Sequence, residues 1–68
     1  MQQPLDDLSD PARRVYDFLA ADPDSTFDVD SIAAAVGLTA GETEAALREL
    51  EAGSRAAEAF GPKWSVLL

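Results

Sequence analysis

The short interval between Gly37 and Thr39 constrains the fold of this sequence more than any other feature. Apolar residues recur at helical spacing up to Val36, and Gly37 is placed as the residue that closes such a helix. Thr39 is followed three positions later by Glu42, and Thr-x-x-Glu is the capping box that opens a helix. The sequence therefore predicts two helices joined only by Gly37-Leu38-Thr39, a turn tight enough to make them cross steeply.

Another helix is predicted upstream, from the N-cap residue Ser9 to about Ala21. Pro11 fits its first turn, because proline has no backbone N–H to leave unpaired there. The second helix is expected to begin after Asp28, a good N-cap residue, and the third helix is expected to stop at Gly53. One stripe along the third helix is formed by Thr43, Ala46, Leu47 and Leu50.

The C-terminal part predicts a short hairpin, with strands over about residues 55–59 and 63–67 and a turn at Gly61-Pro62. Thr26-Phe27, between the first two helices, allows only a stub of strand. Trp64 has two interpretations, since it can cover the core or stack on a nucleic-acid base. The scarcity of large side chains in so small a domain favours the core.

A chain of 68 residues has room for one domain with a thin core. Alanine supplies 13 of the hydrophobic residues and leaves 19 larger ones, which suits three closely packed helices. The predicted fold class is mainly α with a small β-hairpin. The predicted domain covers residues 9–68 and follows a flexible lead-in over residues 1–8.

The absence of cysteine and histidine argues against catalysis and against metal binding. It removes the thiolate and imidazole ligands of zinc and the commonest general base. The acidic run that begins at Asp22 does not fit a calcium-binding EF-hand loop, because its sixth and twelfth positions are Phe27 and Ala33 rather than Gly and Glu. The chain is predicted to be no enzyme and to need no metal or cofactor.

The net charge of −8 has the wrong sign for non-specific attraction to nucleic acid or to an anionic membrane. Residues 1–30 carry −6 and residues 31–68 carry −2, so any basic contact surface must come from the second part. Two explanations of the acidity stay open, namely adaptation to high salt and a GC-rich genome. No apolar window long enough for a membrane span and no signal peptide is visible, so a cytoplasmic protein is expected.

The run Ile32-Ala33-Ala34-Ala35-Val36-Gly37-Leu38-Thr39, followed by Leu47-x-x-Leu50-Glu51, resembles the winged helix-turn-helix family of bacterial and archaeal regulators. The resemblance covers roughly residues 9–67 and implies three helices and a hairpin, the wing. The segment Gly61-Pro62-Lys63-Trp64-Ser65-Val66 is also similar to the end of Z-DNA-binding winged helices. That subfamily relies on a Lys, an Asn and a Tyr where this sequence has Ala40, Glu44 and Arg48, so only the fold is carried over.

The resemblance makes the third helix the recognition helix and the hairpin the wing. Arg48 is expected to pair with guanine or to hold a phosphate, although Glu44, four residues earlier, offers a surface ion pair instead. Thr39 and Thr43 are expected to donate to phosphate oxygens, with Thr43 assigned outward despite its place in the apolar stripe. The predicted DNA-binding residues are Thr39, Ala40, Thr43, Glu44, Arg48, Arg55 and Lys63.

Two functions of different kinds remain open after the sequence analysis. The first is a transcriptional regulator that binds double-stranded DNA through the third helix and the wing, as a homodimer because one small module touches few base pairs. The second is a winged-helix module that docks on a protein partner, for which an acidic surface is no handicap. The tight turn and the wing cations favour DNA binding, whereas the net charge favours a protein partner.

Overall fold

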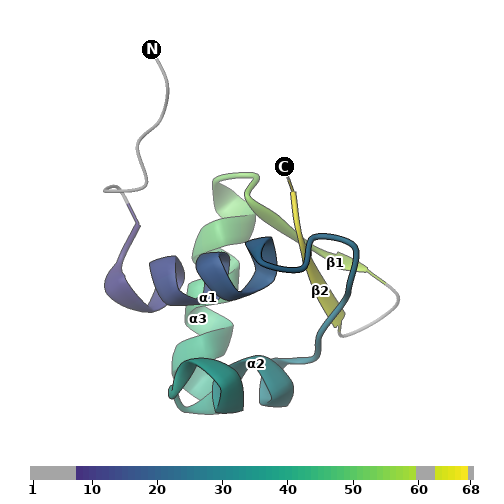
Figure 1. Cartoon of the computed structure of the whole chain (residues 1–68). Coiled ribbons are helices and arrows are strands. Elements are labelled where there is room, and N and C mark those ends of the chain that lie inside the picture. Colours follow the sequence, from purple (N-terminus) through teal and green to yellow (C-terminus); the bar gives the residue numbers. More distant parts are fainter. Residues whose placement is uncertain (1–7, 60–62, 68) are drawn as a thin grey trace.

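A computed structural model describes residues 8–59 and 63–67, which form three helices followed by an antiparallel hairpin (Figure 1). This order confirms the predicted class and is that of a winged helix-turn-helix fold. The two strands of the hairpin pair in a register that sets Ala56 opposite Val66. The elements are α1 (Asp10–Ala20), α2 (Val29–Val36), α3 (Ala40–Ala52), β1 (Ala56–Ala59) and β2 (Lys63–Val66).

The helices α2 and α3 begin where side chains can satisfy their first backbone N–H groups. The backbone N–H of Ser31 donates to Asp28 Oδ1 at 2.7 Å, which caps α2. At the start of α3, the N–H of Glu42 donates to Thr39 Oγ1 at 3.1 Å and the N–H of Thr39 donates to Glu42 Oε1 at 3.0 Å. The predicted capping box is therefore confirmed, and the starts of α2 and α3 are both fixed by local hydrogen bonds.

The turn between α2 and α3 depends on the left-handed backbone of Gly37, whose φ is 75°. The N–H groups of Gly37 and Leu38 both donate to the carbonyl of Ala33 at 3.0 Å, which closes α2 in one residue. Leu38 is half-buried against the core. The chain can therefore join α2 to α3 through only three residues, as the sequence predicts.

The end of α3 uses a serine where glycine is the usual choice. Gly53 follows the helix with a negative φ, and the left-handed residue is Ser54, with φ 59°. The N–H of Ser54 donates to the carbonyl of Glu51 at 3.0 Å, and that of Arg55 donates to Leu50 at 2.8 Å. This hydrogen-bond pattern is a Schellman motif, and it turns the chain from α3 into the hairpin.

The core lies where the buried faces of the three helices meet one side of the hairpin (Figure 1). Trp64 is only 2% exposed, which confirms its predicted role as a core cover. Phe27 forms an isolated antiparallel bridge with Trp64, through hydrogen bonds of 2.9 and 2.7 Å, so the predicted strand stub is also confirmed. At the other end of the molecule, the N–H and hydroxyl of Ser9 both donate to Glu49, which ties the start of α1 to α3.

Some of the predicted features lie outside the described residues. They are most of the lead-in over residues 1–8 and the turn at Gly61-Pro62. Leu8, the last residue of the lead-in, is described and is buried in the core.

Changes at the two left-handed positions should move stability in opposite directions. Ser54→Gly removes the cost of a Cβ at positive φ and should raise the free energy of unfolding by about 1 kcal/mol. Gly37→Ala adds that cost and should lower it by about 1 kcal/mol. A Cβ at Gly37 would meet no atom within 4 Å, so the loss there reports the backbone alone. Urea unfolding measures both variants, and shifts of the same sign would contradict this account.

Acidification should weaken the caps of α2 and α3. The hydrogen bond from Ser31 lowers the pKa of Asp28 below its usual 3.8, and the hydrogen bond from Thr39 lowers the pKa of Glu42 below its usual 4.5. A carboxyl group with a lowered folded pKa stabilises the fold above its unfolded pKa, and this contribution is lost as the pH falls through the folded value. The thermal midpoint should therefore fall as the pH drops below about 4.

The double variant Asp28→Asn/Glu42→Gln is the control for the acid effect. Asparagine caps a helix about as well as aspartate, and glutamine replaces glutamate in a capping box, but neither titrates. The drop in thermal midpoint between neutral and acidic pH should be smaller in the variant than in the wild type. Equal drops would show that the caps do not contribute to the pH dependence.

Candidate nucleic-acid interface

Four of the eight exposed positions of α3 carry small side chains, and the other four carry charged ones. A Cβ added at Gly41 would meet no atom within 4 Å, so the helix surface is open there. Small residues let a helix backbone approach a groove closely, which suits the predicted role of this face. The exposed positions of the N-cap and the helix are Thr39, Ala40, Gly41, Glu42, Glu44, Ala45, Arg48, Glu51 and Ala52.

Thr43 does not belong to this face, and its expected phosphate contact is corrected. The side chain is fully buried, with an exposed fraction of 0%, alongside Ala46 and Leu47 on the inner side of α3. Its hydroxyl has no hydrogen-bond partner among the described residues. The helical periodicity of the sequence places Thr43 in the apolar stripe, and that periodicity is the better guide.

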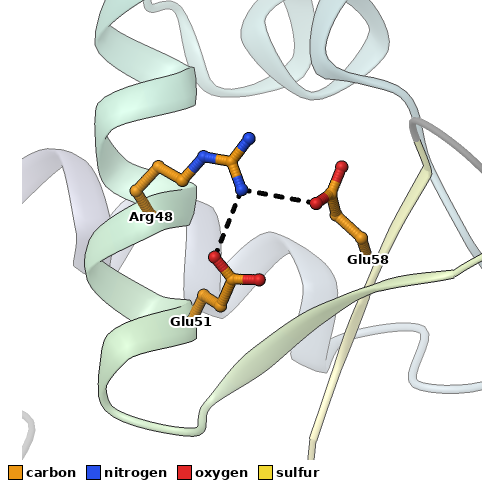
Figure 2. Close-up of polar contacts among 3 residues, drawn as sticks. All are labelled: Arg48, Glu51 and Glu58. Carbon is orange, nitrogen blue, oxygen red and sulfur yellow. Dashed lines mark hydrogen bonds and ion pairs between the residues drawn. The ribbon is translucent and has the colours of Figure 1, made fainter.

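Arg48 is held by three neighbours where α3 faces the hairpin, and Figure 2 shows two of them, Glu51 and Glu58. Its Nη1 donates to Glu51 Oε1 at 3.2 Å and to Glu58 Oε1 at 3.3 Å. Its Cζ lies 5.3 Å from the ring centroid of Trp64, which is a cation–π contact. Hydrogen bonds to Glu51 and then Glu58 raise the pKa of Arg48 above its usual value. We call these four residues the Arg48 cluster, and 55% of the Arg48 side chain remains exposed in it.

The Arg48 cluster replaces the surface pair expected between Glu44 and Arg48. Among the described residues, the ion pairs of Arg48 are those with Glu51 and Glu58. The i,i+3 spacing of Arg48 and Glu51 is a signal that the sequence does contain. Glu58 is ten positions away, and it reaches Arg48 because the hairpin register sets it opposite Trp64. That partner cannot be found without the register.

The two cations of the hairpin lie at its opposite ends. Arg55 precedes β1, and its carbonyl accepts from the N–H of Leu67 at 2.9 Å at the open end. Lys63 is exposed at the first position of β2, next to the turn. Lys63 is also close enough to Asp28 to contribute, as a minor cause, to the lowered pKa of that carboxyl. The structure therefore does not bring Arg55 and Lys63 together into one basic patch.

The surface formed by α3 and the hairpin is more acidic than basic. Within residues 39–59 and 63–67, its cations are Arg48, Arg55 and Lys63. Its exposed acids are Glu42, Glu44, Glu51 and Glu58. The shape of this surface suits close approach to a groove, whereas its charge provides few contacts for phosphates.

Neither a metal site nor a membrane span is found in the part of the chain that the structure describes. Over residues 8–59 and 63–67, no three His, Cys, Asp or Glu side chains gather where they could hold a metal ion. None of the helices in these segments has the length and apolar character needed to cross a bilayer.

Comparison with protein families matches the model of the DprA winged helix domain to residues 1–57 of this chain. No curated protein matches the chain. Among solved structures, the Zα domain of Carassius auratus PKZ, determined in complex with Z-DNA, is similar with a TM-score of 0.74 and 20% identity. The match covers 84% of this chain and 92% of that one.

A second similar structure is a possible transcriptional regulator from Methanosarcina mazei Go1, with a TM-score of 0.77 and 13% identity. The match covers 91% of this chain and 58% of that one, so this chain spans less than two thirds of the regulator. At these identities, both structures show a common winged helix fold and nothing finer.

Removing the buried hydroxyl of Thr43 should stabilise the protein. Thr43→Val keeps the shape of the side chain and removes an unpaired polar atom, so the free energy of unfolding should rise by about 1 kcal/mol. The same substitution at the N-cap, Thr39→Val, should lower it by about 1 kcal/mol because it destroys the capping box. Chemical denaturation compares the two variants. A loss of stability in Thr43→Val would show that the hydroxyl has a partner in solution.

Proposed function

The chain belongs to the DprA winged helix domain family, and on that premise we propose that it binds double-stranded DNA through α3 and the hairpin. The observation that carries the proposal is the exposed face of α3, whose first two turns contain the small residues Ala40, Gly41 and Ala45, with Arg48 at the point where this face meets the hairpin. The fold is shared with a Zα domain that was determined in complex with Z-DNA, which supports the same class of ligand.

In this proposal the residues of the interface have different tasks. Arg55 and Lys63 contact phosphates at the two ends of the hairpin. The Thr39 hydroxyl accepts from the N–H of Glu42, so it can donate its own proton to a phosphate oxygen. Ala40 allows the backbone to approach the groove, and Glu44 lies on the same exposed face.

The proposed biological role is transcriptional regulation by a homodimer. A single small module contacts few base pairs, and two copies double the base contacts, whose contributions to the free energy of discrimination add. The similar protein from Methanosarcina mazei Go1 is itself described as a possible transcriptional regulator.

A second candidate function is docking on a protein partner with a basic surface. The Arg48 cluster favours it, because Glu51 and Glu58 neutralise the one cation on the exposed face of α3. The net charge of −8 acts in the same direction, since it repels phosphates and attracts cationic surfaces.

A binding titration on random-sequence duplex DNA over a salt series separates the two functions. With phosphate contacts from Arg55 and Lys63, log K should fall with log salt with a slope of about −2. The protein without DNA gives the reference signal. A scrambled-sequence peptide of equal charge is the control for binding that depends on net charge alone. Absence of binding at low salt would overturn the DNA proposal and leave the protein-docking function.

Glu44→Gln should tighten binding to any duplex. It removes one negative charge from the face that would meet the DNA, so affinity should rise roughly twofold to fivefold at low salt, and the gain should shrink as salt rises. Asp17→Asn is the matched control, because it removes the same charge from an exposed position of α1. An equal gain in both variants would indicate a net-charge effect and would argue against contact through α3.

A further inference from the structure

The Arg48 cluster restrains only one end of the guanidinium group. Both carboxylates accept from Nη1, and Figure 2 shows them on that side of the group. Among the described residues, none accepts a hydrogen bond from Nε or Nη2. Arginine carries five N–H donors, so three of them remain available, and two of these three, Nε–H and one Nη2–H, lie on the Nε–Nη2 edge. The contact with the Trp64 ring adds a third restraint on the orientation of the group.

The available edge is the one that arginine uses for paired recognition. Nε–H and one Nη2–H point in parallel, and this fork matches two acceptor atoms that lie side by side. A guanidinium already held from its other end loses less conformational freedom when it binds than a free arginine does. The cluster therefore presents a prearranged pair of donors at the surface of α3.

The charge of the cluster selects between the two kinds of paired acceptor that DNA offers. One arginine and two glutamates give the cluster a net charge of −1. A phosphate that approached the Nε–Nη2 edge would be attracted by one cation and repelled by two carboxylates. A neutral pair of acceptors is not repelled in this way, and it still gains two charge-assisted hydrogen bonds.

Guanine is the base that offers such a neutral pair. Its O6 and N7 atoms are both acceptors in the major groove. Adenine presents N7 beside an amino donor, and thymine and cytosine each offer at most one acceptor there. An arginine fork therefore distinguishes guanine from the other three bases.

We propose that Arg48 reads the O6/N7 edge of a guanine through Nε and Nη2, and that Glu51 and Glu58 are positioning residues that hold its Nη1 end. This inference rests on the proposed DNA-binding function and gives that function a sequence preference. It also assigns the phosphate contacts to other residues, of which Arg55 and Lys63 are the available cations.

The first test compares two random duplex pools, one of them with every dG replaced by 7-deaza-dG, which lacks the N7 acceptor. The wild type should bind the ordinary pool several-fold more tightly. Arg48→Ala should bind both pools equally, and Arg48→Lys, which keeps the charge but lacks the fork, should do the same. Because Arg48 is exposed, both variants should fold, and their thermal melts check this.

The salt dependence separates base contact from phosphate contact. Arg48→Ala should leave the slope of log K against log salt unchanged, whereas Arg55→Ala should make it shallower by about one unit. A slope reduced by about one in Arg48→Ala, or a wild type that does not distinguish the two pools, would overturn the guanine assignment. A wild type that binds neither pool overturns the proposed function, and the guanine assignment with it.

The roles of Glu51 and Glu58 are tested by the ratio of affinities for the two pools. Glu51→Ala/Glu58→Ala should raise both affinities through the lost charges, but the ratio should fall toward one because Arg48 is no longer held. Glu51→Gln/Glu58→Gln, whose amide oxygens still accept from Nη1, should restore the ratio. Trp64 is the single tryptophan of the chain, so a change in its emission should accompany the release of Arg48. An unchanged ratio in the alanine variant would overturn the positioning role.

Discussion

The left-handed turn at Gly37, followed at once by the capping box of α3, is the constraint on which the rest of the structure depends. It fixes the residue at which α3 begins and therefore which side of that helix is buried. A displacement of the turn by one residue would rotate every α3 side chain by about 100° about the helix axis. Glu44 would then move toward the position of Thr43 in the core. Among the described residues, no charged side chain is buried there.

The helix ends could be predicted from the sequence because their causes are local. A cap needs one side chain and a backbone N–H three residues away, as at Asp28 and Thr39, and both lie within the same short segment. The inner face of α3 was equally predictable from its periodicity. Thr43 is instructive, because the periodicity placed it in the core while the family resemblance placed it on the DNA-binding face. The burial follows the periodicity, because the pattern of apolar residues in this chain decides which side of α3 packs into the core.

The geometry of the site could not be predicted in the same way, because it arises from tertiary contacts. Glu58 meets Arg48 only after the hairpin register has set it opposite Trp64. The separation of Arg55 and Lys63 likewise follows from the pairing of the two strands, which puts one residue at each end of the hairpin. The sequence shows which charged residues are present. Which of them form ion pairs and which lie apart depends on contacts between elements that are distant in the sequence.

The acidic surface and a DNA-binding role are compatible if affinity depends little on phosphates. A protein with six to ten phosphate contacts loses roughly three to five orders of magnitude in affinity between low and moderate salt, and one with two contacts loses far less. A domain that has five cations and thirteen acids belongs to the second case, in which few phosphates are contacted and affinity depends weakly on salt. In the proposed function, specificity therefore comes from hydrogen bonds to base edges, which are short-ranged and only weakly screened. The carboxylates around Arg48 also favour base contacts over phosphate contacts, because they weaken the attraction of Arg48 for phosphate and leave its Nε–Nη2 edge available. A surface of this kind would retain its selectivity in concentrated salt, whereas a surface that binds through many phosphate contacts would lose its affinity for DNA.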